Sequence, residues 1–242
     1  MLKNNFPVVI LVNPQLPDKI GMSARAMMNC GFNNLRIVKP REGWPNKIAI
    51  HSAVYAKKII EKAKIYSSFE DSISDLNFLI ATSIRKRISN VEHLYDYNKL
   101  SKFISSYSKV GLVFGQENSG LTNEHISKCN CIFSIPLYNM NNSLNLSHSV
   151  LLMCYEISKL IKNYSKFPSK KMDIATKKEF NDLMNHLYID LKYSGFLHPP
   201  EKSKSMFLNI QNMFGRANFS SQEVKTFRGI LNRLKKPRKL GK

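Results

Sequence analysis

Short apolar segments alternate with longer amphipathic segments through the first ~160 residues, and this alternation limits the possible folds more than any other feature. Strands are predicted over residues 6–12, 35–38, 78–82, 110–114 and 131–135. Helices are predicted over residues 20–30, 50–63, 94–107 and 144–161. This pattern indicates an α/β fold whose parallel sheet is covered by helices on both faces. Ligands of such sheets bind at the carboxyl ends of strands, so the loops after residues 12, 82, 114 and 135 form the candidate site.

A polar segment over residues 163–176 follows this region and contains the helix breaker Pro168. It separates a predicted α/β domain, residues 1–162, from a small helical extension, residues 177–242. Helical patterns cover residues 177–193, 201–214 and 220–234, and the last of them begins with a capping-box-like Ser220–Glu223. The extension ends in a basic run.

The net charge of +20 produces a positive field that favours polyanions such as nucleic acids. Lysine- and asparagine-rich codon usage raises such a charge too, so charge alone does not decide the partner. No apolar run approaches the ~18 residues that span a bilayer, and the first residues lack the apolar stretch of a signal peptide. We therefore expect a cytoplasmic protein with no membrane partner.

Four scattered cysteines and the absence of any Gly-x-Gly exclude several classes of protein. Cys129 and Cys131 are too close together for the usual zinc spacing, and no second pair accompanies them. We expect buried, reduced thiols and no metal. The dinucleotide-type glycine loop and the Walker A pattern are both missing, which disfavours a Rossmann methyltransferase or dehydrogenase.

The loop over residues 13–27 is the first of three that hold more polar residues and glycines than a core requires. A proline-bracketed turn leads into a helix with small residues that allow close backbone approach. Arg25 is expected about one turn into that helix, facing the strand ends. A helix N-terminus with an arginine is a natural phosphate site, although an ordinary strand–helix turn with a surface arginine explains the same residues.

The second loop, residues 114–122, follows a buried strand that ends in glycine. Gly115 would let a ligand approach the backbone, and Thr122 is placed to cap a short helix. Glu117 is expected to receive a hydroxyl or an amine, or else to pair with Arg25. The third loop, residues 135–147, is rich in asparagine and serine, which suit either a neutral or cationic small molecule or merely a well-capped helix.

Taken in this order, the three loops resemble the three motifs of the SPOUT methyltransferases, whose sheet contains a deep trefoil knot that binds S-adenosylmethionine. More narrowly, the chain resembles the bacterial tRNA (cytidine/uridine) 2′-O-methyltransferases that act on nucleotide 32 of the anticodon loop. The likeness continues through residues 82–87, 195–201, 213–217 and 223–231, and so covers nearly the whole chain. Departures from the family pattern occur at Lys19, Ile84 and Asn141.

The resemblance implies three sets of site residues and S-adenosylmethionine as the cofactor. The catalytic set is Arg25, Ser143 and Glu117. The cofactor would lie against Thr82, Ser83, Ile84, Gly115, Ile135, Asn142, Ser143 and Leu144. The RNA would contact Lys19, Arg25, Arg85, Arg87, Arg216 and Arg228.

Arg25 is assigned as a clamp on the target phosphate, because a guanidinium with a pKa above ~12 is a poor base at neutral pH. We expect it to face the same pocket as the loops near residues 82, 115 and 135, with Ser143 bonded either to the nucleophile or to Arg25. The resemblance further implies a symmetric homodimer whose active site is completed across the interface.

The helical extension and the basic tail are expected to grip tRNA. Its aromatic residues recur at helix spacing and are expected in its core rather than as base-stacking platforms: Tyr188, Tyr193, Phe196, Phe207, Phe214, Phe219 and Phe227.

Two other functions fit the sequence. One is a related 2′-O-methyltransferase that acts on rRNA or on another tRNA position, which mapping of the methylated nucleotide would distinguish. The other is a non-catalytic RNA-binding protein of the same fold, which a calorimetric titration with S-adenosylmethionine would identify.

Overall fold

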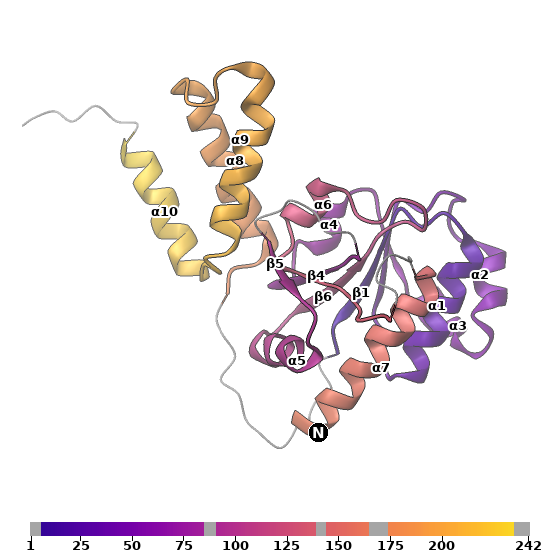
Figure 1. Ribbon diagram of the computed structural model, residues 1–242. Helices are drawn as coiled ribbons and strands as arrows, with labels where there is room; N and C mark the ends of the chain where they lie inside the picture. The colour runs from indigo at the N-terminus through magenta and orange to yellow at the C-terminus, as the bar shows by residue number, and fades with distance from the viewer. Residues whose placement is uncertain (1–5, 85–90, 139–143, 165–173, 235–242) are drawn as a thin grey trace, which may run out of the picture.

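The computed structural model describes residues 6–84, 91–138, 144–164 and 174–234, with backbone only for residues 161–164. A seven-stranded sheet forms its centre, in the order β3-β2-β1-β6-β4-β7-β5 (Figure 1). The strands are β1 (Val8–Val12), β2 (Leu35–Val38), β3 (Lys64–Tyr66), β4 (Phe78–Thr82), β5 (Glu92–Leu94), β6 (Val110–Phe114) and β7 (Cys131–Phe133). Every neighbouring pair is parallel, which confirms the predicted parallel α/β sheet.

Helices cover both faces of the sheet because each central strand is apolar on both sides. Val9 and Leu11 of β1 point into one core together with α1 (Pro17–Asn29), α5 (Tyr97–Ser106) and α7 (Leu146–Tyr164). Val8, Ile10 and Val12 point into a second core with two short helices, α4 (Phe69–Ile73) and α6 (Asn123–Ser127). The four cysteines are buried and free, as expected.

The predicted single helix over residues 50–63 was wrong. The structure has α2 (Lys47–Ser52), a 3-10 turn η1 (Val54–Ala56) and α3 (Lys57–Glu61). The first piece starts early because the Asn46 side chain accepts the N–H groups of Ile48 and Ala49. The break follows from Val54, whose φ of 52° cannot continue a right-handed helix.

The helix predicted over residues 94–107 also begins later than expected. Asp96 caps α5 by accepting the N–H of Asn98, and residues 92–94 form the edge strand β5 instead. The edge strand β3 was not predicted either. Both are short and contain a charged residue, Lys64 in β3 and Glu92 in β5, so neither stands out as an apolar run.

Three further helices form an appendage with its own core: α8 (Lys177–Tyr193), α9 (Pro200–Gly215) and α10 (Ser221–Leu234). Phe207, Phe214, Phe219 and Phe227 pack into that core, and Tyr188 stacks edge-on against Phe207, as expected.

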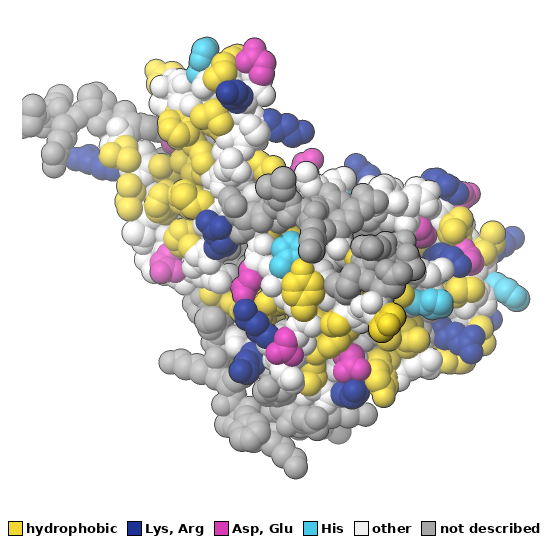
Figure 2. Space-filling model, in the orientation of Figure 1, with side chains coloured by type: hydrophobic (Ala, Val, Ile, Leu, Met, Phe, Trp, Pro, Cys, Tyr) yellow, Lys and Arg dark blue, Asp and Glu magenta, His cyan; other side chains and the backbone are white. Residues whose placement is uncertain are grey.

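Tyr193 and Phe196 depart from the expected core packing, because they are 96% and 56% exposed. Figure 2 shows hydrophobic side chains gathered over the appendage. The capping box predicted at Ser220 is present, since its N–H donates to Glu223 Oε2 and its Oγ accepts the N–H of Glu223.

The appendage is fastened to the α/β unit at the amino ends of two strands. The N–H of Lys177 donates to the carbonyl of Leu76 at 2.8 Å, just before β4. Asn77 Nδ2 donates to the carbonyl of Ile174, and Asn130 Nδ2, just before β7, donates to Asn218 Oδ1. The appendage therefore lies beside α4 and α6, on the side of the sheet away from α7 (Figure 1).

Candidate functional site

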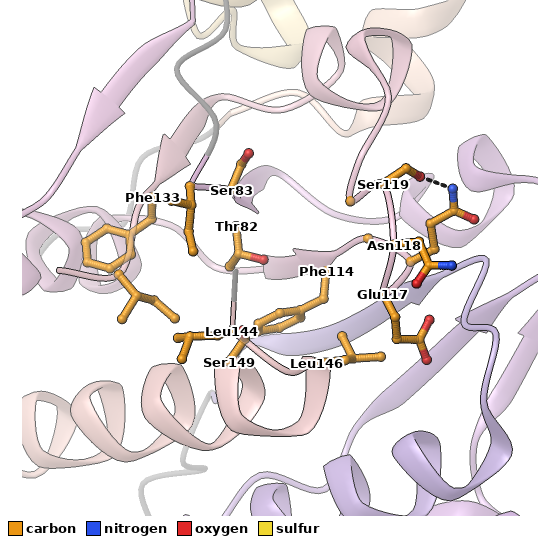
Figure 3. A pocket seen from close by; sticks show the side chains of 15 residues that line it. Thr82, Ser83, Phe114, Glu117, Asn118, Ser119, Phe133, Leu144, Leu146 and Ser149 are labelled. Atoms are coloured by element: carbon orange, nitrogen blue, oxygen red, sulfur yellow. Dashed lines mark hydrogen bonds between the residues drawn. The ribbon is translucent and has the colours of Figure 1, made fainter. Parts of the chain in front are cut away.

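A cavity of about 150 Å³ opens at the carboxyl ends of β4, β6 and β7, where the sequence predicts the site (Figure 3). Its walls come from the ends of these strands, the loop after β6 and the start of α7. The lining residues are Thr82, Ser83, Ile84, Phe114, Gly115, Gln116, Glu117, Asn118, Ser119, Gly120, Phe133, Ile135, Leu144, Leu146 and Ser149. Because the carboxyl ends of parallel strands share one edge of the sheet, loops far apart in sequence meet here.

Most of the residues predicted to bind the cofactor are brought together by this cavity. Six of them line it: Thr82, Ser83, Ile84, Gly115, Ile135 and Leu144. Asn142 and Ser143 lie outside the described residues, as do Arg85, Arg87 and Asn141. The prediction missed eight lining residues, of which four have polar side chains: Gln116, Asn118, Ser119 and Ser149. The first three stand in the polar loop already singled out, and Ser149 follows Leu146 by one helical turn.

The strand ends at the cavity are held in place by hydrogen bonds from hydroxyl groups. Thr82 Oγ1 donates to the carbonyl of Val113 at 2.9 Å, which joins the end of β4 to β6. Ser134 Oγ donates to the carbonyl of Ser83 at 2.5 Å, which joins it to β7. These two bonds connect the ends of β4, β6 and β7 at the rim of the cavity.

Gly115 is required by the fold of the loop itself, apart from the ligand approach that the sequence suggested. A Cβ on this residue would lie 2.2 Å from the carbonyl carbon of Gly120 and 2.3 Å from the backbone nitrogen of Leu121. The loop after β6 folds back on itself, with a bridge between Gln116 and Gly120, so the backbone that approaches Gly115 is the protein's own. The predicted cap is present, because Thr122 Oγ1 accepts the N–H of His125 at the start of α6.

Glu117 lies at the N-terminus of α1 rather than beside Arg25. Its Oε2 accepts the N–H of Gln15 at 2.9 Å and its Oε1 accepts the N–H of Leu16 at 3.2 Å. Leu16 is the N-cap of α1 and its side chain makes no capping bond, so this carboxylate from about 100 residues away takes over that role. The helix N-terminus that the sequence suggested as a phosphate site therefore holds the protein's own anion.

Arg25 does not line the cavity, contrary to the expected convergence. Because α1 begins at Pro17, Arg25 lies eight residues beyond the start, about 12 Å along the axis, and not one turn in. Its neighbours Ala24 and Ala26 are buried, whereas Arg25 points to the exposed face of α1.

The exposed face that holds Arg25 is on the same side of the sheet as α7. There, Arg25 Nε donates to Tyr55 Oη at 3.4 Å.

The other predicted RNA contacts occupy separate surfaces. Lys19 is half-buried near the start of α1, with its Nζ 3.2 Å from Asp18 Oδ2. Arg216 and Arg228 are exposed on the appendage, at the end of α9 and within α10. The residues predicted to contact RNA thus form no single patch within the described part of one chain.

No cluster of three or more potential metal ligands occurs among the described residues. In the same part of the chain, none of the helices combines the length and the apolar character needed to cross a membrane.

Comparison with known proteins gives matches along almost the whole chain. The model of the SpoU rRNA Methylase family matches residues 7–155, and that of the tRNA methyltransferase TrmJ C-terminal domain matches residues 178–242. The tRNA (cytidine-2'-O-)-methyltransferase TrmJ of Methanocaldococcus jannaschii is 37% identical, over 90% of this chain and 95% of the relative. The tRNA (cytidine/uridine/adenosine-2'-O-)-methyltransferase TrmJ of Pseudomonas aeruginosa is 32% identical, over 94% and 93%. The crystal structure of TrmJ from Z. mobilis ZM4 gives a TM-score of 0.87 at 29% identity, over 96% of this chain and 100% of that one.

Proposed function

Because the chain belongs to the SpoU methylase family, we propose that it transfers a methyl group from S-adenosylmethionine to a ribose 2′-hydroxyl of tRNA. The observation that carries the proposal is the meeting of the loops after β4, β6 and β7 in one cavity. The match of residues 178–242 to a tRNA methyltransferase domain favours tRNA over rRNA. The anticodon-loop position, cytidine or uridine 32, rests on the resemblance of the sequence alone.

The composition of the cavity fits the proposed cofactor. Ile84, Ile135, Leu144 and Leu146 supply apolar surface for a flat heteroaromatic ring, and the polar loop 115–120 supplies hydrogen-bonding groups for a ribose. When bound, S-adenosylmethionine supplies the electrophilic methyl group. The chain itself holds and aligns the reactants, which is where its contribution to the rate arises.

Arg25 is proposed to bind the phosphate next to the target ribose and so orient the 2′-hydroxyl, which rests on its charge and on its place in the first motif. Its position on the outer face of α1 suits a dimer in which a second copy covers α1 and α7. Met22, Leu151 and Tyr155 on these helices are 42%, 39% and 51% exposed. In such a symmetric dimer the partner's Arg25 completes the pocket.

We also propose a division into a methyltransferase domain (residues 1–162), a linker (163–176) and a tRNA-binding appendage (177–242), and a trefoil knot in the first domain. The similarity to the Z. mobilis structure along the whole chain supports these proposals. At the end of the linker, the carbonyl of Ile174 accepts a hydrogen bond from Asn77, and the N–H of Ala175 donates to the carbonyl of Phe219.

The direct test is transfer of tritiated methyl groups from S-adenosylmethionine to total tRNA, followed by nucleoside mapping. The expected product is 2′-O-methylated cytidine or uridine at position 32. Label in rRNA alone, or at another tRNA position, would redirect the assignment to a related enzyme. If calorimetry detected no binding of S-adenosylmethionine to the chain, the assignment would change to a non-catalytic RNA-binding protein.

Arg25→Ala tests the clamp. We expect it to abolish methylation while cofactor affinity changes by no more than a few-fold. Near-normal turnover in this variant would refute the role of Arg25.

A further inference from the structure

The backbone at Val54 adopts a conformation that valine rarely accepts. Its φ is 52°, a left-handed conformation that is a genuine outlier for a β-branched residue. The strained residue directly precedes Tyr55 and interrupts the helical segment between α2 and α3. Strain of this kind persists where the surrounding structure holds it, often beside a functional group.

Tyr55 reaches across to α1 and contacts two of its side chains. Arg25 Nε donates to Tyr55 Oη at 3.4 Å, and Tyr55 Oη donates to Asn29 Oδ1 at 2.6 Å. The guanidinium carbon of Arg25 also lies 5.3 Å from the centroid of the Tyr55 ring. The phenol therefore contacts Arg25 through both its oxygen and its ring.

These contacts use only part of the guanidinium group. Among the described residues the one hydrogen bond of Arg25 runs through Nε, and it does not use the donors of the two terminal nitrogens. A bidentate grip on a phosphate needs two N–H donors in a fixed orientation. An exposed arginine has many rotamers, and ordering it costs entropy that a prior contact reduces. The hydrogen bond from Arg25 also lowers the pKa of Tyr55, as expected for a phenol oxygen that faces a cation.

We propose that Tyr55 is a positioning residue, which with Asn29 holds Arg25 ready to bind a phosphodiester group of the RNA. The inference rests on the proposed function, because it assumes that Arg25 binds substrate phosphate. Tyr55 acts through Arg25 and does not itself touch the RNA.

The test compares Tyr55→Phe, Arg25→Ala and the double variant by their Kd for tRNA. Tyr55→Phe keeps the ring and removes the oxygen that accepts from Arg25. We expect it to raise the Kd and the KM for tRNA by up to about tenfold, because binding must then order the side chain of Arg25, which costs about 0.5–1.5 kcal/mol. The Kd for S-adenosylmethionine and the melting temperature should not change. In the Arg25→Ala background the same substitution should have no further effect on the Kd for tRNA.

Tyr95→Phe is the matched control, because Tyr95 is 45% exposed and Tyr55 48%. If Tyr55→Phe left the Kd for tRNA unchanged while Arg25→Ala raised it, the inference would be overturned and the proposed function would stand. An equal loss in both backgrounds would also overturn it, because Tyr55 would then contact the RNA directly. Unchanged tRNA binding and turnover in Arg25→Ala would remove the role proposed for Arg25 itself.

Discussion

The carboxylate of Glu117 replaces the missing cap of α1, and removing it should loosen the loop that leads into this helix. Glu117→Ala deletes the acceptors for the N–H groups of Gln15 and Leu16. Hydrogen bonds to charged groups contribute about 1.5–3 kcal/mol when sheltered. Glu117 is half-buried and the bond from Leu16 is exposed. We therefore expect the loss of both bonds to lower the free energy of local opening by about 2 kcal/mol in total, which makes opening roughly 30-fold more frequent.

Hydrogen exchange at the Gln15 and Leu16 amides measures this opening directly, and both should exchange about 30-fold faster in Glu117→Ala. The kcat/KM for tRNA should fall by up to the same factor, because Glu117, which holds this loop, also lines the cavity. Glu117→Gln keeps one acceptor oxygen but loses the charge, so it should lie between wild type and Glu117→Ala. Glu61→Gln, at an exposed position on α3, is the control.

Unchanged exchange at Gln15 and Leu16 in Glu117→Ala would refute the capping role. A loss of activity without faster exchange would instead mean that Glu117 acts on the reactants directly.

Three further variants test other parts of the structure. Burial lowers the pKa of Lys177 to about 8, so between pH 8 and ~10.4 the unfolded chain holds a proton that the native state lacks, and stability should rise with pH in that window. Lys177→Met should abolish this rise, measured by urea unfolding, and should raise the free energy of unfolding at pH 7 by up to about 3 kcal/mol. A wild-type free energy of unfolding that does not change between pH 8 and ~10.4 would contradict the reasoning. Val54→Gly should relieve the strain of the positive φ, which costs about 1 kcal/mol, and so raise the melting temperature by a few degrees. A lower melting temperature would show that the valine side chain stabilises the fold by more than the strain costs. Tyr193 and Phe196 are exposed and can stack on bases, so replacing both by serine should weaken tRNA binding at least several-fold at constant melting temperature. Unchanged affinity would show that these rings do not stack on bases.

Five of the strands could be predicted from sequence because apolar residues predominate in each of them, between polar breaks. The cavity followed from those strands, since residues such as Thr82, Gly115 and Ile135 lie at or within two residues of strand ends that share one edge. The broken helix at Val54 could not be predicted, because valine does not favour the left-handed backbone that it adopts there.

The contacts of Glu117 and Arg25 were beyond the reach of the sequence for two physical reasons. Glu117 meets Gln15 across 102 residues, and no local pattern reports such a contact. Placing Arg25 depends on where α1 starts, because a start three residues earlier puts it about 4.5 Å farther from the helix N-terminus and turns it by about 60° relative to that end. An error in one helix boundary therefore becomes an error in the direction of a side chain.

The appendage joins the sheet at the amino ends of β4 and β7, whereas the cavity opens at their carboxyl ends. The five residues of β4 separate the two by about 16 Å. Under the proposed function the sheet sets a spacing, because an RNA that contacts both the cavity and the appendage must span at least this distance. An enzyme of this kind would recognise the shape of the RNA around the target nucleotide, because the part held by the appendage must lie at a fixed distance from the part held at the cavity.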